Sequence, residues 1–170
     1  MSKFKVTIKG PSISESVDEI TATIKHQMEG RAVKAANELR NSSQIVLSGQ
    51  RSGRRYKVPG TFARQRDRTD GKMKNGRYYT ASAPGEAPAM RTGLFRGRWQ
   101  PTSLVSNGRY LSRIENDVMT DDGKHNLGEI LENGSGRMAP RPHHDRILQH
   151  AEQEIVRIYD QSYFNGEEQS

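Results

Sequence analysis

Histidines and carboxylates are the side chains of this 170-residue chain whose types suit catalysis or metal binding, and they are densest at His143-His144-Asp145. On a helix, sequence neighbours point to different faces, and His150 would lie about 10 Å from His143 along the axis. We therefore predict that His143 and His144 form a solvated or interface pair. A metal-dependent nuclease that uses this histidine cluster is a further alternative.

Two other patterns offer weaker signals of chemistry. The stretch "GSGRMA" (134–139) fits the dinucleotide fingerprint G-x-G-x-x-A, but that motif requires a strand before it and a helix after it. Here a helical pattern precedes it, and Pro140 and Pro142 follow. The carboxylates of Asp121 and Asp122 have no base or further ligand in reach by sequence. We predict that the protein is not an enzyme and has no catalytic residue, metal or cofactor.

Composition predicts a small hydrophobic core. Hydrophobic residues make up 32% of the chain, whereas a net charge of +7 is too low to hold 170 residues unfolded by self-repulsion. We predict that the core is completed by burial against neighbouring subunits. Cysteine is absent, which excludes disulfides and thiolate metal sites. No apolar run is long enough for a membrane span or a signal peptide, so we expect no membrane partner and synthesis in a cytosol.

The net positive charge of the chain comes from residues 51–77, which hold ten Arg or Lys and two Asp. Glycine, proline and the absence of periodicity predict an extended basic loop or hairpin arm over residues 49–80, with "RRYKV" and "GRYYTAS" as its strands. Interleaved Tyr56, Phe62, Tyr78 and Tyr79 suit base stacking. The arm therefore predicts docking on an acidic protein surface or contact with nucleic acid. The residues predicted to face this partner or DNA are Arg51, Arg54, Arg55, Lys57, Arg64, Arg66, Arg68, Lys72, Lys74 and Arg77.

Hydrophobic periodicity predicts the elements around this arm. Residues 3–9 alternate as in a strand, and a stripe from Val17 to Leu39 indicates one long helix capped by Ser12 or Ser14. Two strands joined by Asn107-Gly108 follow, with a core that includes Trp99 and Leu104.

A short helix is expected over 127–134, and a final helix begins at Pro142. We predict a single α+β domain (1–170) with a flexible tail at 165–170. In it a small antiparallel sheet is packed by one long N-terminal helix and a C-terminal helix.

The stretch "ASAPGEAPAMRTGLFRGRW" (81–99) is too stiff for a linker. Each residue before a proline is disfavoured from helix, so Ala83 and Ala87 are expected to be extended. Thr92 is placed to cap a short helical turn that carries Leu94 and Phe95. A preorganised extended strap with an apolar anchor loses little entropy on docking, which predicts an interface element.

This stretch resembles a signature of the tail-completion, or head–tail joining (neck), proteins of long-tailed bacteriophages. The family's Ala-Pro-Gly-Glu-Pro-Pro and Thr-Gly pattern is matched here, with Ala87 where proline is usual. A second resemblance is "LENGSGRMAPRPHHDRIL", where the family reads Leu-Glu-aromatic-Gly and then Met-Ala-x-Arg-Pro. Asn133 departs from the aromatic, and His143-His144 replace an apolar-aromatic pair. The matching residues are Ala83, Pro84, Gly85, Glu86, Pro88, Thr92, Gly93, Leu131, Glu132, Gly134, Met138, Ala139, Arg141 and Pro142.

The resemblance implies a structural virion protein that forms a homo-oligomeric ring, most often a hexamer. Such a ring lies at the head–tail interface or the top of the tail tube and has no catalytic step. Its implied partners are further copies of itself, the head connector or adaptor, the tail tube or tail terminator, and genomic DNA in the channel. The alternative function is that of a nucleic-acid-binding module that uses residues 51–77. The residues expected at subunit interfaces are Ala83, Pro84, Gly85, Glu86, Pro88, Thr92, Leu94, Phe95, Arg141 and Pro142.

Overall fold

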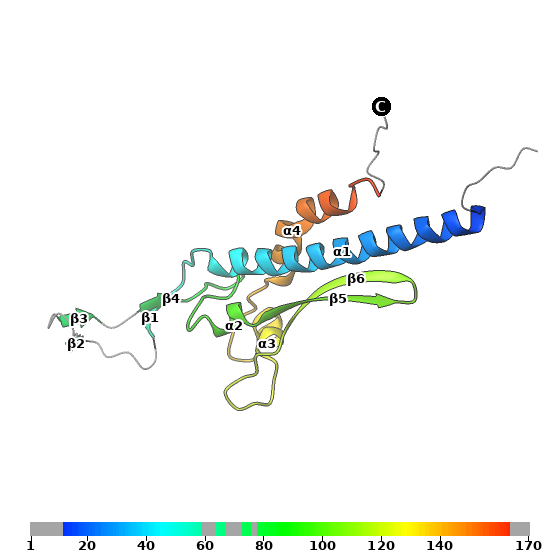
Figure 1. Cartoon of the computed structure of the whole chain (residues 1–170). Helices are drawn as coiled ribbons and strands as arrows, with labels where there is room; N and C mark the ends of the chain where they lie inside the picture. The colour runs from blue at the N-terminus through cyan, green and yellow to red at the C-terminus, as the bar shows by residue number, and fades with distance from the viewer. Residues whose placement is uncertain (1–11, 59–63, 67–72, 76–77, 164–170) are drawn as a thin grey trace, which may run out of the picture.

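The computed structural model describes residues 12–58, 64–66, 73–75 and 78–163, which form an α+β architecture (Figure 1). The long helix α1 (Ile13–Ser48) and the C-terminal helix α4 (His144–Tyr159) pack along each other, and small antiparallel two-stranded sheets pack against α1. The predicted fold class is confirmed. The predicted strand at 3–9 and the tail at 165–170 lie outside the described residues.

Helix α1 begins with a capping box. The Ser12 hydroxyl accepts a hydrogen bond from the Glu15 amide (3.2 Å), and the Glu15 carboxylate accepts one from the Ser12 amide (2.7 Å). The helix then runs without interruption through Gly30 and past Asn41, where the hydrophobic pattern fades in the sequence. Tertiary packing of its second half explains this extra length, because the buried residues of α1 extend as far as Leu47.

The N-terminal half of α1 is largely left uncovered by the other residues that the structure describes. Val17 is 54% exposed and Ile20 is 47% exposed, so the apolar stripe that predicted this helix is buried only in its second half. The reason is the length of α4, whose last residue, Tyr159, lies level with Arg31: the Arg31 guanidinium donates to the Tyr159 carbonyl (3.1 Å). The buried residues of α1 are Arg31, Ala32, Ala35, Ala36, Leu39, Ser42, Ser43 and Leu47.

Strands β5 (Trp99–Ser106) and β6 (Arg109–Asn116) form the predicted hairpin. Asn107 and Gly108 both have positive φ, as a tight type I′ turn requires. Trp99 is buried as predicted, but Leu104 is 39% exposed and does not belong to the core. The sheet face toward α1 carries polar side chains near this point, since the Ser112 hydroxyl donates to the Ala32 carbonyl (2.8 Å).

The core lies where α1, β5 and α4 meet. Leu47, Trp99 and Ile147 form its buried centre, with Val46, Phe95 and Ile114 packed against them. Alanines are prominent among the buried residues of α1 and α4, and small side chains let packed helices approach closely. The buried alanines on the two helices are Ala32, Ala35, Ala36 and Ala151.

The basic segment forms a hairpin arm. Strands β1 (Arg55–Lys57) and β4 (Tyr78–Thr80) pair antiparallel, and β2 (Arg64–Arg66) pairs with β3 (Met73–Asn75). The arm stands away from the body beyond the C-terminal end of α1 (Figure 1). Four residues predicted to contact a partner, Phe62, Arg68, Lys72 and Arg77, lie outside the described residues.

Two short helices precede α4 in the chain. Helix α2 (Leu94–Gly97) has Gly93, and not Thr92, as its N-cap residue. The Thr92 hydroxyl nevertheless accepts from the Leu94 amide (3.3 Å), so Thr92 satisfies a free donor of this turn as expected. Helix α3 (Leu127–Asn133) is ended by Gly134, also as expected. Within the described residues, no helix is long and apolar enough to cross a membrane.

The prediction that the last helix begins at Pro142 is wrong, because α4 begins at His144 with His143 as its N-cap residue. The cause lies in the preceding residues. The Arg141 amide donates to the Leu131 carbonyl (2.7 Å), which holds this part of the chain against α3.

Candidate functional site

The two segments that carry the family resemblance meet in one place. The Arg141 guanidinium donates to the carbonyl oxygens of Ser82 and Ala83 (3.0 Å for Ala83) and to the Ser82 hydroxyl (2.7 Å). In addition, the Gly85 amide donates to the Pro140 carbonyl (3.1 Å). Residues about 60 positions apart are thereby fixed side by side, so the two motifs form a single structural unit within one chain.

The first motif is a turn and not a continuously extended strap. The Glu86 amide donates to the Ala83 carbonyl (3.1 Å), and Gly85 between them has φ 77°. Proline followed by a positive-φ glycine is the pattern of a type II turn. The expectation of an extended segment is therefore wrong at Pro84-Gly85, because the glycine lets the chain reverse there.

The Glu86 carboxylate links this turn to Ser52, which lies just before the arm in the chain. Its carboxylate accepts hydrogen bonds from the Ser52 hydroxyl (2.6 Å), the Ala83 amide (2.8 Å) and the Ser52 amide (3.1 Å). These bonds, led by that of the Ser52 hydroxyl, lower the pKa of Glu86 to about 2. Glu86 therefore stays ionised over nearly the whole accessible pH range.

The residues expected at subunit interfaces divide into inward and outward groups. Pro88 is buried, its carbonyl accepts from the Arg51 guanidinium (3.1 Å), and Phe95 packs edge-on against Trp99. Arg51 also donates to the Val46 carbonyl near the end of α1, so its guanidinium is engaged within the chain. The expected interface residues that are exposed, and thus open to another subunit, are Pro84, Gly85, Thr92 and Leu94.

The exposed residues of the arm combine positive charge with aromatic rings. Arg54 lies over the ring of Tyr56 (5.6 Å to the centroid), and Arg55 lies over the ring of Tyr78 (4.9 Å). Lys57 is exposed next to them. The other predicted contact residues among the described ones belong to β2 and β3, namely Arg64, Arg66 and Lys74.

The histidine pair has a different environment from the one predicted. His143 is completely buried, and its ring lies edge-on to Phe95 (5.5 Å) and Trp99 (5.9 Å), so the solvated or interface prediction is wrong for His143. The side chain of His144 is 51% exposed. The two rings nevertheless lie together, with centroids 4.5 Å apart, because His143 precedes α4 and has non-helical φ and ψ.

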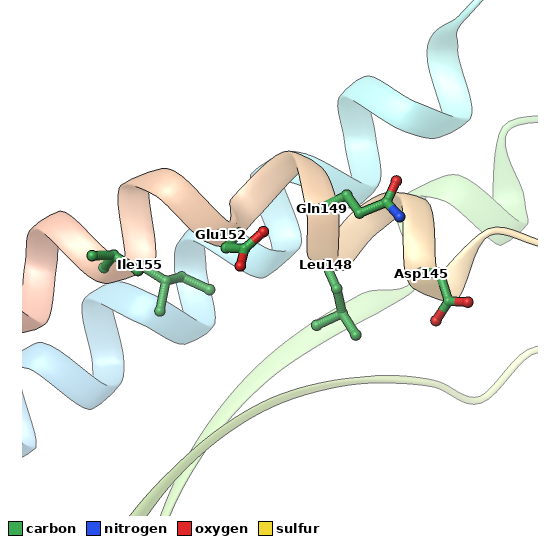
Figure 2. Close-up of a pocket in the computed structure, with 6 residues that line it drawn as sticks. Asp145, Leu148, Gln149, Glu152 and Ile155 are labelled. Atoms are coloured by element: carbon green, nitrogen blue, oxygen red, sulfur yellow. The ribbon is translucent and has the colours of Figure 1, made fainter.

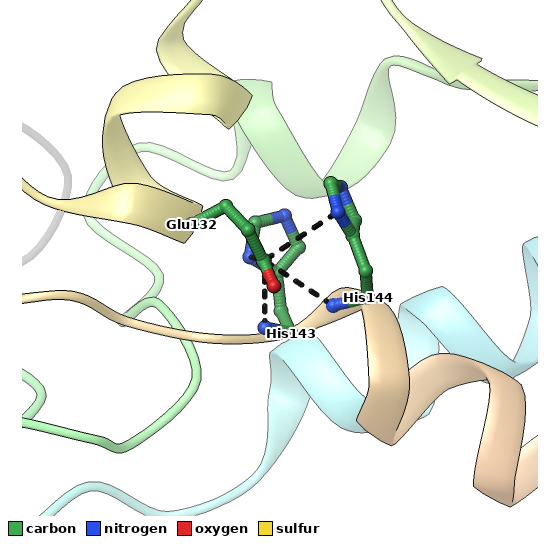
Figure 3. A group of neighbouring side chains, drawn as sticks. All are labelled: Glu132, His143 and His144. Carbon is green, nitrogen blue, oxygen red and sulfur yellow. Dashed lines mark hydrogen bonds and ion pairs between the residues drawn. The ribbon is translucent and has the colours of Figure 1, made fainter.

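Glu132 of α3 joins both histidines (Figure 3). Its Oε2 accepts from the backbone amides of His143 (2.9 Å) and His144 (3.3 Å), which are free donors at the start of α4. The same oxygen lies 2.8 Å from Nδ1 of His143 and 3.6 Å from Nδ1 of His144. Sequence reasoning missed Glu132 as a partner, because a carboxylate on another helix gives no periodic signal.

Burial is the main cause that lowers the pKa of His143, so its imidazole is neutral at pH 7. Nδ1 of His143 faces two acceptors, Glu132 Oε2 and the Arg141 carbonyl (3.1 Å), so in this arrangement it carries the ring proton. Nε2 of His143 and Nε1 of Trp99 are buried without a hydrogen-bond partner in the part of the chain that the structure describes.

Comparisons of the chain with protein-family models, with curated proteins and with solved structures find no match.

Proposed function

We propose that the protein is a structural virion component that forms a homo-oligomeric ring at a phage head–tail junction or at the top of the tail tube. The observation that carries this proposal is an apolar stripe of α1 that the other described residues leave exposed. Ile13, Val17 and Ile20 follow one another at steps of four and three, so they lie on one face of the helix. All three are about half exposed or more, and a contiguous apolar face of this kind marks a protein–protein contact.

A second apolar surface lies on the outer side of α4 (Figure 2), away from the buried face of that helix. Leu148 is 56% exposed and Val156 is 60% exposed. A groove there is lined by Asp145, Leu148, Gln149, Glu152, Ile155 and Val156. Two different apolar surfaces on one chain suit a head-to-tail contact between copies, and such contacts form a ring when the rotation from one copy to the next closes.

The arm supports a role for the protein at a junction with a further component. It extends beyond the body, and its basic residues would complement an acidic surface on a neighbouring protein. The fixed turn formed by Ala83–Glu86 and Arg141 positions the base of this arm. The arm is then the element that connects the ring to the head connector, the adaptor or the tail tube.

Replacement of residues 56–79 by a short Gly-Ser link tests this role. The link joins Arg55 to Thr80, which are already paired across the hairpin, so the body should keep its melting temperature. We expect electron micrographs of the assembling phage to show separate heads and tails. Normal virions would refute the junction role of the arm.

The alternative is a nucleic-acid-binding module, and the observation that favours it is the pairing of Arg54 and Arg55 with exposed Tyr56 and Tyr78. Aromatic stacking and phosphate neutralisation would then act together. Fluorescence anisotropy with single- and double-stranded oligonucleotides at rising salt separates the two functions. Submicromolar binding that weakens steeply with salt, and that disappears in Arg54→Ser/Arg55→Ser, would support the alternative.

A further inference from the structure

We propose that Glu132, His143 and His144 bind a transition-metal ion of the Zn²⁺ type. Each residue offers one ligand atom, and these atoms all lie within 4.8 Å of one another. Glu132 Oε2 is 2.8 Å from Nδ1 of His143 and 3.6 Å from Nδ1 of His144. Ligands of a tetrahedral ion at about 2.0–2.1 Å lie about 3.3–3.5 Å apart, so these two distances need to change by less than about 1 Å. Nδ1 of His143 carries the ring proton in the metal-free arrangement, so binding of the ion releases this proton and replaces its hydrogen bonds to Glu132 and to the Arg141 carbonyl.

The donor set fits Zn²⁺ better than a hard cation. Two imidazole nitrogens and one carboxylate oxygen are ligands that zinc accepts, whereas Ca²⁺ and Mg²⁺ take oxygen ligands. Three protein ligands leave a fourth position open. The side chain of His144 is 51% exposed, so the ion has a path from solvent to the site.

The surroundings hold these ligands in place before an ion arrives. The ring of His143 is fixed by edge-on contacts to Phe95 and Trp99. The four contacts of the Glu132 carboxylate with His143 and His144 all reach Oε2, so Oε1 is not engaged in them. Oε2 is therefore the carboxylate oxygen that is in place to coordinate an ion together with the two Nδ1 atoms.

Two features set the expected strength and role of the site. The N-terminus of α4 carries partial positive charge, which disfavours a cation, and the charge of Glu132 offsets it. We therefore expect weaker binding than at a closed four-ligand zinc site, in the micromolar range. A bound ion would link α3 to the first turn of α4 and stabilise this junction.

The chain contains a single tryptophan, which makes the site observable. Trp99 lies 5.9 Å from the ring of His143 and 6.2 Å from that of His144, so a paramagnetic ion bound there should quench its fluorescence. The experiment uses the full chain without a histidine tag, after treatment with a chelator. Titration with Zn²⁺ is followed by calorimetry, and titration with Co²⁺ is followed by Trp99 fluorescence and visible absorption.

Two variants test the ligands. His144→Ala changes an exposed side chain and should fold normally, as checked by circular dichroism; Glu132→Gln keeps an oxygen that can cap α4 but removes the charge. We expect one ion per chain in the wild type and at least a tenfold loss of affinity in both variants. The matched control, His26→Ala, removes another exposed histidine and should bind as the wild type does. Absence of Zn²⁺ binding by the wild type, or equal affinity in His144→Ala, would overturn the proposal.

Discussion

Gly134 is the position at which a single methyl group should damage the fold most clearly. Its backbone has φ 77° and ψ −172°, a region that is essentially restricted to glycine, and strain there costs about 1–3 kcal/mol. A Cβ atom at this position would lie 2.7 Å from the Met138 carbonyl oxygen and 2.8 Å from the Pro140 nitrogen. Relief of such contacts requires the backbone to move, at a further cost of about 1–3 kcal/mol.

We therefore expect Gly134→Ala to lower the free energy of unfolding by about 3–5 kcal/mol. For a domain of this size about 2–4 °C is lost per kcal/mol, so the melting temperature should fall by roughly 10 °C. Calorimetry and chemical denaturation at one fixed protein concentration measure both quantities, because association of copies would itself change them.

Gly136→Ala is the matched control for this change. Gly136 lies two residues further along the same loop, its φ is not positive, and a Cβ there meets no atom within 4 Å. Its stability should stay within about 0.5 kcal/mol of the wild type. If Gly134→Ala is as stable as Gly136→Ala, then the turn between α3 and Arg141 is not constrained as described, and its role in placing the start of α4 is refuted.

Two further predictions concern the unit formed by the two motifs. Arg141→Lys should lower the free energy of unfolding, measured by urea denaturation, by about 2–3 kcal/mol. The reason is that one ammonium group cannot replace a guanidinium that donates to both Ser82 and Ala83. A loss of stability no larger than that caused by Arg137→Lys, at an exposed arginine, would contradict this prediction. The pKa of Glu86 is lowered, so the stabilisation by its carboxylate is complete above the usual glutamate pKa of 4.5 and is lost as the pH falls toward about 2. Glu86→Gln should therefore make protein stability depend less steeply on pH between these two values. An unchanged dependence would show that the carboxylate is not hydrogen-bonded as described.

The elements that local rules determine could be predicted from the sequence. Asn107-Gly108 fixed the hairpin because few dipeptides adopt two successive positive φ angles, and Ser12 with Glu15 is a local capping pattern. Gly134 likewise ends α3 where its position indicated. Each of these signals is contained within a few neighbouring residues.

The parts that depend on distant residues could not be predicted. Whether Val17 and Ile20 are covered depends on where α4 ends alongside α1. The residue pattern of α1 contains no information on the length of α4. The pairing of His143 and His144 with Glu132 depends on a non-helical residue before α4 and on a carboxylate from α3. Glu132 was visible as a motif residue, but only the fold assigns its partners.

The central claim is that copies of this chain associate through the uncovered face of α1. Native mass spectrometry of the purified full chain tests it most directly, with Val17→Glu/Ile20→Glu as the disruptive variant. Ala22→Glu, on the opposite exposed face of the same helix, is the control. We predict one closed oligomer for the wild type and for Ala22→Glu, and a folded monomer for the double variant. A monomeric wild type, or an oligomer that the double variant leaves intact, would contradict the account.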